Sequence, residues 1–325
     1  MALRFVRRSP FSIDDDLNSP VLSDHVNWLE KFCESKFFQL PSSFSLHAEN
    51  LYKQGHIVGM DAASVASVWA LQLEPHLSCI DTCCAPGMKF SLIGDYCVDV
   101  TGLDVSEHRL DVCHTLLGKY GYSSLQERTF LVSPNWCVGG EGISTQFLQV
   151  RASRKRKKKG KKRPRTGQEV SDPLLRQYDR VLVDAECTHD GSARHTSKHS
   201  SESTEFVDDS APMSGFWTRQ SDKSRVQYDS EEKIAALVEK QKVLILNGFR
   251  LLKPGGLMVY STCSLQSIQN EDVVKHLLET EQDAVVGTLP FGKEVPAKFL
   301  SEGMCLFDPA TSGTSGQFIA VIRRS

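Results

Sequence analysis

The sequence predicts an α/β protein built on a mostly parallel β-sheet, and two observations support this. Apolar segments typical of buried strands alternate along the chain with segments whose apolar residues have helical spacing. The strand segments are continuously apolar, as expected for a parallel sheet covered by helices on both faces. The chain has 325 residues, of which 40% are hydrophobic and 24% charged, so it can bury a sizeable core.

The expected elements follow one another in order. Helix 106–121 begins after an N-cap serine and ends at a glycine, and helix 231–252 stops at Lys253-Pro-Gly-Gly. The C-terminal stretch 304–324 is expected to form an antiparallel strand pair that closes the sheet. The buried strands are expected at 77–83, 97–105, 128–133, 178–185 and 256–263, and the other helices at 89–96 and 270–279.

Composition divides the chain into an N-terminal extension and one domain that carries two insertions. Residues 1–46 are expected to be an N-terminal extension, and residues 47–325 a single domain rather than two. Two disordered insertions are expected within that domain, because their sequences are polar and lack apolar periodicity. The insertions cover about 138–177, which contains a basic run, and about 192–230, which is rich in Ser, Asp, Thr and His.

The basic run at 151–165, RASRKRKKKGKKRPR, holds 11 of the 38 basic residues and no acid. Without it the chain has 27 basic and 40 acidic residues, a net charge of −13. Such a block is typical of a nuclear-import signal or of a segment that contacts nucleic acid, and a solvated loop is the alternative. We expect a nuclear or nucleolar protein, with the cytoplasm as the alternative location.

Several classes are excluded by composition. Ten cysteines are too dilute for a disulfide scaffold, and no apolar run reaches the roughly 18 residues of a membrane span. We therefore expect a soluble intracellular protein with reduced cysteines and no membrane contact. Cys187, His189, His195 and His199 are close in sequence but fit no zinc-site spacing, so no metal site is expected.

The ends of the first two strands predict a cofactor site. The first strand runs into Asp81-Thr-Cys-Cys-Ala-Pro-Gly-Met-Lys89, and the second ends at Asp104. A turn of this kind brings backbone N–H groups close to a ligand, and a carboxylate after the second strand can bind ribose hydroxyls. Neither G-x-G-x-x-G nor the P-loop motif is present, so a nicotinamide fingerprint is absent. The spacing favours a nucleoside-containing cofactor, and a tight structural turn is the alternative.

The ends of the fourth and fifth strands predict a reactive centre. Cys187 and Cys263 follow these two strands, and Asp184 lies three residues before the first of them. A single cysteine is more often a small core residue than a nucleophile. Two cysteines at neighbouring strand ends, beside a carboxylate and a cofactor turn, favour nucleophilic chemistry instead.

Five segments together carry a resemblance to a known family: DTCCAPGMK, LDVSEHRL, VLVDAECT, LLKPGGLMVYSTCSL and GQFIAVI. In this order they resemble the Nol/Nop/Sun (Sun-domain) family of RNA cytosine-5 methyltransferases, from about Gly55 to the C-terminus. The resemblance implies a Rossmann-like class I methyltransferase with a mostly parallel seven-stranded sheet. It also implies S-adenosyl-L-methionine as cofactor and RNA, ribosomal or transfer, as partner. We expect a monomer.

The resemblance implies a role for each motif residue. Cys263 would be the nucleophile, Cys187 would assist product release, and Asp184 would lie between cofactor and target base. Asp104 would bind the ribose, with Arg109 nearby. The residues that would hold the methionine part of the cofactor are Cys83, Cys84, Ala85, Pro86, Gly87, Met88 and Lys89.

This sequence departs from the family pattern at two places. Glu186 stands where the family usually has proline, and Ser133-Pro-Asn135 stands where an acid usually serves the adenine side.

The implied chemistry explains these residue types. Carbon C5 of cytosine is a weak nucleophile, and a thiolate that adds to C6 pushes charge toward C5. A carboxyl at Asp184 can stabilise that adduct, and the base must be unstacked to be reached. Two alternatives stay open: a catalytically impaired homologue that acts as an RNA-bound assembly factor, and a methyltransferase with a non-RNA substrate.

Overall fold

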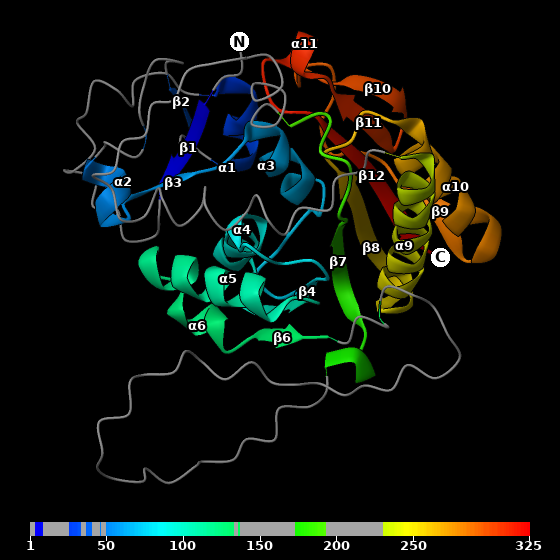
Figure 1. The fold of residues 1–325 in the computed structure, drawn as a ribbon, viewed down its shortest axis with the longest axis horizontal. Coiled ribbons are helices and arrows are strands. Elements are labelled where there is room, and N and C mark those ends of the chain that lie inside the picture. The colour runs from blue at the N-terminus through cyan, green and yellow to red at the C-terminus, as the bar shows by residue number, and fades with distance from the viewer. Residues whose placement is uncertain are drawn as a thin grey trace, which may run out of the picture.

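The structure is a computed structural model that describes residues 4–8, 26–33, 37–40, 46, 50–132, 136, 173–192 and 230–325. These residues form a large mixed sheet with helices on both faces and a small second sheet (Figure 1). The basic run 151–165, most of the two expected insertions and Ser133-Pro-Asn135 lie outside the described residues.

The large sheet has the strand order β10-β11-β12-β8-β7-β4-β5-β6, with β9 paired to β12. Its parallel part is β4 (Ser78–Asp81), β5 (Asp99–Asp104), β6 (Thr129–Leu131), β7 (Tyr178–Asp184) and β8 (Leu252–Thr262). Its antiparallel part is β9 (Ala284–Val286), β10 (Lys298–Ser301), β11 (Met304–Phe307) and β12 (Gln317–Arg324). The predicted α/β class, parallel sheet and antiparallel C-terminal pair are confirmed.

The sheet has nine strands rather than the seven expected. The additional strands, β9 and β10, are short and lie in its antiparallel part. With three and four residues they are too short to give a clear periodic signal in the sequence.

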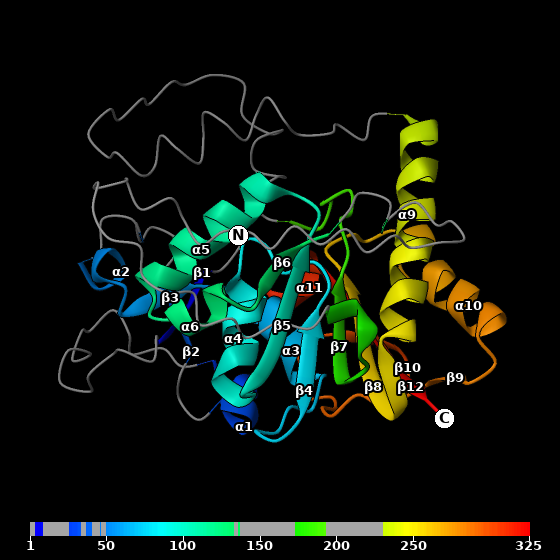
Figure 2. The same cartoon turned by 90° about the horizontal axis from the view of Figure 1, so that it is seen from below.

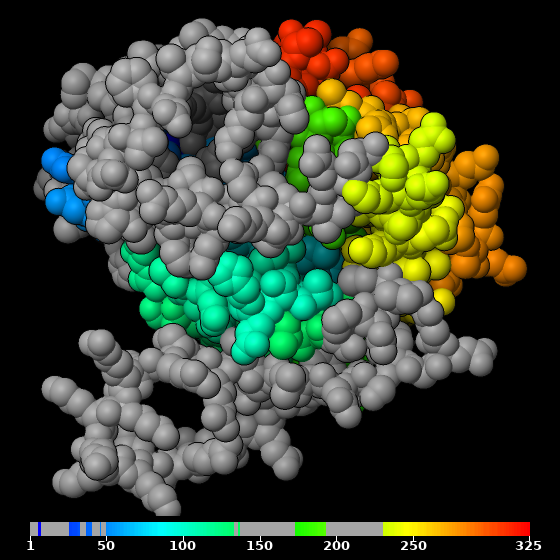
Figure 3. Space-filling model, viewed as in Figure 1, coloured from blue at the N-terminus to red at the C-terminus, as the bar shows by residue number. Residues whose placement is uncertain are grey.

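Two helical layers cover the sheet (Figure 2). Residues of α3 (Ala62–Trp69), α4 (Met88–Tyr96) and α5 (Glu107–Lys119) share one core cluster with Leu257 and Val259 of β8. Residues of α9 (Glu231–Arg250) and α10 (Glu271–Thr280) share the other with Met258 and Tyr260. Alternate residues of β8 thus enter opposite layers, which explains its continuous apolar sequence. The outward side of α9 forms part of the molecular surface in Figure 3.

The predicted serine N-cap of α5 is confirmed, and α9 also begins after a serine N-cap, which was not predicted. The hydroxyls of Ser106 and Ser230 accept hydrogen bonds from the third residue of α5 and α9. The Lys-Pro-Gly-Gly stretch differs from expectation, because it already belongs to β8. Gly255 has φ of +75° there, a conformation that suits glycine. The shorter helices are α1 (Glu30–Cys33), α2 (Asn50–Gln54), α6 (Ser123–Gln126) and α11 (Pro309–Ser312).

The second sheet was not expected from the sequence. It has the order β2-β1-β3 and consists of β1 (Arg4–Arg8), β2 (Phe37–Leu40) and β3 (Ile57–Gly59). Strands β1 and β2 precede residue 46, and β3 follows it. The domain boundary expected at residue 46 stays a prediction. The buried Arg7 donates to Ser91 Oγ at 2.5 Å and pairs with Asp95, so this sheet is anchored to α4. None of the helices described here is both long and apolar enough to cross a membrane.

Candidate functional site

The carboxyl ends of three neighbouring strands carry the polar groups of the site. Strand β7 pairs in parallel with both β4 and β8, so Asp81, Asp184 and Cys263 come to one edge of the sheet. Asp184 lies opposite Ser261 in the register, and the buried Ser261 Oγ donates to Asp184 Oδ1 at 2.7 Å. Parallel pairing thus brings together residues about 80 positions apart.

The two predicted cysteines are in contact. Cys187 Sγ and Cys263 Sγ lie 3.0 Å apart, and Cys187 is buried while Cys263 is half-buried. Glu186 is exposed, and its carbonyl oxygen accepts a hydrogen bond from Gln241 Nε2 at 2.7 Å. Glutamate in place of the usual proline therefore leaves Cys187 facing Cys263.

His189 completes this cluster. Its Nδ1 lies 2.8 Å from Cys263 Sγ and 3.6 Å from Cys187 Sγ. The sequence showed His189 only as one member of a weak zinc-like group, and the signal that could have separated it was its position two residues after Cys187. The structure brings His189 to both sulfurs because the chain turns back at this residue, with φ of +58°.

One negative charge is shared within the cysteine pair. The hydrogen bond from Cys263, supported by His189, lowers the pKa of Cys187 to about 5 despite its burial. The pKa of Cys263 is raised, first by its bond to Cys187 and then by burial, because a second ionisation would place two charges 3.0 Å apart. One of the two sulfurs is therefore anionic at neutral pH.

A cation and two carboxyls lie beside the cysteines. Lys89 Nζ is 2.8 Å from Asp184 Oδ2, and these side chains are 15% and 28% exposed. Burial alone would lower the pKa of Lys89, but the Asp184 carboxylate raises it overall. Burial, followed by the charge of Asp184, raises the pKa of Asp81 to about 7. Lys89 is thus held as a cation between two acids.

The turn after β4 is tight at Gly87. Gly87 has φ of +109°, and a Cβ atom built on it would lie 2.8 Å from Cys113 Sγ, so glycine is required. Met88 begins α4, Pro86 is exposed, and Cys83 is half-buried with its N–H donated to Asp81 Oδ1. Cys84 and Ala85 are buried, and their backbone N–H groups donate to the Leu103 carbonyl and to Asp104.

Asp104 lies at the end of β5, beside this turn. Its carboxylate accepts hydrogen bonds from Ser106 N at 2.9 Å and Ala85 N at 3.3 Å. Arg109 Nη1 lies 3.4 Å from the same carboxylate, and Arg109 also donates to the Ala85 carbonyl. Burial raises the pKa of Asp104, and Arg109 opposes this rise.

The Asp104 carboxylate is an acceptor of the kind that a nucleoside cofactor needs. A carboxylate at this strand end can accept from both ribose hydroxyls. The Asp104 side chain is only 1% exposed, whereas Arg109 is 48% exposed. A ribose would therefore reach the carboxylate after Arg109 rotates toward solvent.

The cluster also contains ligand types that bind zinc. Among the described residues, Cys187, His189 and Cys263 place three such atoms within 4.8 Å of one another. Two sulfurs at about 2.3 Å from a tetrahedral zinc would lie roughly 3.8 Å apart. The observed 3.0 Å is shorter, so the geometry is that of a thiol–imidazole cluster.

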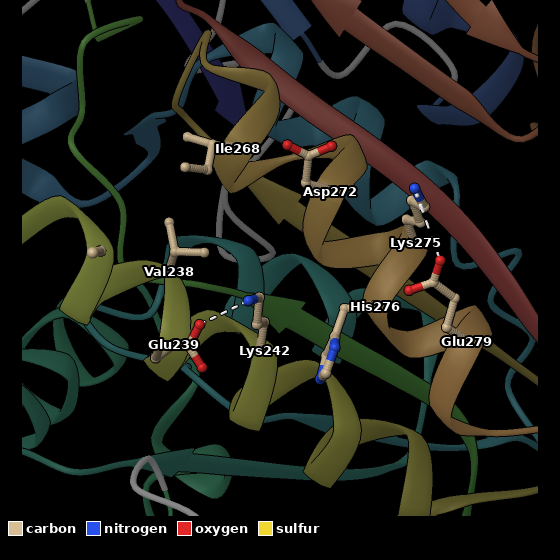
Figure 4. A pocket seen from close by; sticks show the side chains of 9 residues that line it. Val238, Glu239, Lys242, Ile268, Asp272, Lys275, His276 and Glu279 are labelled. Carbon is tan, nitrogen blue, oxygen red and sulfur yellow. Dashed lines mark hydrogen bonds and ion pairs between the residues drawn. The ribbon is translucent and has the colours of Figure 1, made fainter.

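A groove of about 380 Å³ lies elsewhere, between α9 and α10 (Figure 4). It is lined mainly by charged side chains, including Glu239, Lys242 and Asp272, and by Val238 and Ile268. None of the predicted site residues lines it.

The chain is similar in sequence to known rRNA methyltransferases. A family model described as "16S rRNA methyltransferase RsmB/F" matches residues 193–323. The chain is 33% identical over 153 residues to a ribosomal RNA small subunit methyltransferase F of Vibrio campbellii, which covers 46% of this chain and 27% of the relative. It is also 27% identical over 299 residues to a 28S rRNA (cytosine-C(5))-methyltransferase of Mus musculus. That match covers 88% of this chain and 50% of the relative.

A solved structure confirms the fold. A methyltransferase homologue from Pyrococcus horikoshii superposes with a TM-score of 0.63 at 23% identity, over 100% of this chain and 87% of that one. The matches to the two curated relatives span a quarter to a half of those proteins' length.

Proposed function

We propose that the chain belongs to the Nol/Nop/Sun family of methyltransferases and that it transfers a methyl group from S-adenosyl-L-methionine to C5 of a cytosine in RNA. The observation that carries the proposal is the contact of Cys263 with Cys187 beside Asp184 and Lys89, at the carboxyl ends of β7 and β8. This is the edge of the sheet where α/β proteins bind their ligands.

The cofactor supplies an electrophilic methyl group. The Cys83–Lys89 turn would hold its methionine part, and Asp104 with Arg109 its ribose. Asp184 faces the same edge of the sheet, held by Ser261 and Lys89, and would lie between the cofactor and the target base.

The residues of the chain then act in sequence on the cytosine. The Cys263 thiolate adds to C6, and the C5–C6 double-bond electrons shift toward C5, which becomes the nucleophile. Asp184 stabilises the adduct through N3 and the exocyclic amine. After C5 is methylated and loses its proton, the C6–S bond breaks and its electron pair returns to Cys263. We assign assistance in this release to Cys187, whose sulfur is 3.0 Å from Cys263 Sγ.

The RNA is expected to be ribosomal, since the relatives named above are rRNA methyltransferases. The target cytosine has to be single-stranded or flipped out, because a stacked base cannot receive a thiol at C6. The basic run 151–165 would add phosphate contact and a nuclear-import signal, which favours a nuclear or nucleolar protein. We expect the chain to act as a monomer without metal.

The experiment that tests this function is methyl transfer to RNA. The purified chain is incubated with tritiated S-adenosyl-L-methionine and total RNA, and the digested RNA is resolved into nucleosides. Label is expected in 5-methylcytidine with the native chain. Less than about 1% of it is expected with Cys263→Ala, because loss of covalent activation raises the barrier by several kcal/mol.

Two other outcomes would contradict the proposal. RNA binding without any label in RNA would indicate an assembly factor. Label in protein or in a small molecule alone would indicate another substrate class.

A further inference from the structure

The segment Thr188–Gly191 holds the imidazole of His189 against the two sulfurs. Among the described residues other than glycine, only His189 and Gln72 have positive φ. Such a backbone is uncommon for residues with a side chain and persists where the surroundings impose it.

The surroundings that impose it are hydrogen bonds on either side of His189. Thr188 N donates to Gln269 Oε1 at 3.1 Å, and Gly191 N donates to the Cys263 carbonyl at 3.0 Å. A Cβ atom on Gly191 would lie 2.7 Å from that carbonyl, so the close approach requires glycine. The turn is therefore tied directly to the residue that carries the nucleophile.

The neighbouring acid is poorly placed to deprotonate Cys263. Both oxygens of Asp184 are engaged, Oδ1 by Ser261 at 2.7 Å and Oδ2 by Lys89 at 2.8 Å. Lys89 is a cation in this pair and has no free electron pair to accept a proton. The imidazole Nδ1 of His189, at 2.8 Å, lies within hydrogen-bond distance of Cys263 Sγ and can accept its proton.

We propose that His189 is a catalytic residue of the methyl transfer, whose Nδ1 takes the proton of the Cys263 thiol before the sulfur adds to cytosine. This inference rests on the proposed function. The S–H bond breaks, its electron pair stays on sulfur, and the proton forms an N–H bond, which gives a thiolate beside an imidazolium. When C6–S later breaks, the returning thiolate can take the same proton back.

The charges around His189 favour this ion pair. The loop after β7 contributes Asp184, Glu186, Cys187 and Asp190, β8 contributes Cys263, and α4 contributes Lys89. The pKa of His189 is raised, first by its bond to Cys187, against burial, with Glu186 and Asp184 adding to the rise. Cys187 shares the resulting negative charge with Cys263 across 3.0 Å.

The test measures thiol ionisation without RNA or cofactor, so its failure is distinct from failure of the proposed function. The fully reduced chain is alkylated with iodoacetamide between pH 5 and 9.5, and the rate at Cys263 is followed by peptide mass spectrometry. The variant is His189→Asn, because asparagine tolerates positive φ but is not a base. His76→Asn is the matched control, since His76 is 73% exposed and pairs only with Glu74 among described acids.

The informative readout is the ratio of rates at pH 9 and pH 6. A rate at one pH is ambiguous, because a thiolate of higher pKa is also more nucleophilic. The native chain and His76→Asn are expected to give ratios of a few-fold, since the negative charge that Cys263 shares with Cys187 beside His189 already exists at pH 6. A thiol with an ordinary pKa of about 8.5 gives a ratio of roughly 200, and His189→Asn is expected to approach it. An unchanged ratio in His189→Asn would overturn the proposal.

Two further arms separate a chemical role from other roles. Cys187→Ser should keep the native profile at Cys263, and loss of the profile there would show that the imidazole acts on Cys187 instead. Methylation by His189→Asn should fall at pH 7 and recover at pH 9, whereas a structural defect would not recover. Stoichiometric zinc in the purified native chain, lost in His189→Asn, would also overturn the proposal, because zinc would then ionise the sulfur.

Discussion

The Lys89–Asp184 pair lends itself to a quantitative perturbation. Lys89→Met removes the cation but keeps much of the side-chain volume, and it leaves Asp184 beside Asp81 without a counter-charge. Removing one partner of a fully buried pair costs about 3–5 kcal/mol. Asp184 is 28% exposed and keeps its hydrogen bond from Ser261, so we expect a smaller loss of about 2 kcal/mol in unfolding free energy.

Urea denaturation at pH 7.5 measures this loss. With an m-value of about 2 kcal/mol/M, the midpoint should fall by about 1 M. Lys242→Met is the matched control, because Lys242 pairs with Glu239 at 2.7 Å on the surface of α9, where Glu239 is 69% exposed. Its effect should stay within about 0.5 kcal/mol.

A double-mutant cycle gives the result that would refute the reasoning. Asp184→Asn removes the stranded charge, so Lys89→Met combined with Asp184→Asn should be more stable than Lys89→Met alone. If the two substitutions instead add within about 0.5 kcal/mol, the pair contributes nothing as a pair, and its place in the site needs another explanation.

Three other predictions follow from the site and the sequence. Cys187→Ala should accumulate a covalent RNA–protein adduct, seen as a heat-stable band on a denaturing gel. If no adduct appears, a group other than Cys187 assists product release. The pKa of Asp81 rises to about 7 on folding, so between pH 4 and pH 8 the folded state holds a proton that the unfolded state has released. The stability of the native chain should therefore fall by at most about 4 kcal/mol as pH rises through this range. Asp81→Asn should remove this fall. Thermal melts at both pH values check this, and an unchanged slope in the variant would contradict it. Deleting 151–165 should weaken RNA binding, flatten its salt dependence and move the protein out of the nucleus, as filter binding and microscopy would show; a changed location with an unchanged salt slope would leave only an import role.

The parts of the site that the sequence predicts are those that depend on topology alone. The tips of adjacent parallel strands meet, so Cys187 and Cys263 could be placed together from two strand ends read separately. The five buried strands were likewise predicted, because strands buried on both faces have continuously apolar sequences. Strand β8 is an example, since its alternate apolar residues enter two different cores.

The features that the sequence missed depend on contacts that no local pattern encodes. His189 follows Cys187 in a polar stretch, and only its positive φ and the hydrogen bonds around it turn it toward the sulfurs. The anchoring of β1 by Arg7 onto Ser91 joins residues 84 positions apart. Asp104 is buried because it accepts a hydrogen bond from the turn and pairs with Arg109, and this burial is also a tertiary effect.

Mechanism-based trapping tests the central claim, that Cys263 attacks C6 of a cytosine in RNA, most directly. The native chain is incubated with S-adenosyl-L-methionine and RNA in which 5-azacytidine replaces cytidine, and the covalent complex is digested and mapped by mass spectrometry. Nitrogen at position 5 carries no proton to lose, so the thiol cannot be expelled after methyl transfer. The account predicts a complex that survives heat and detergent, attached through Cys263 and absent from Cys263→Ala. Attachment through Cys187 with Cys263 unmodified would contradict it, as would cytosine methylation of ordinary RNA with no trapped complex.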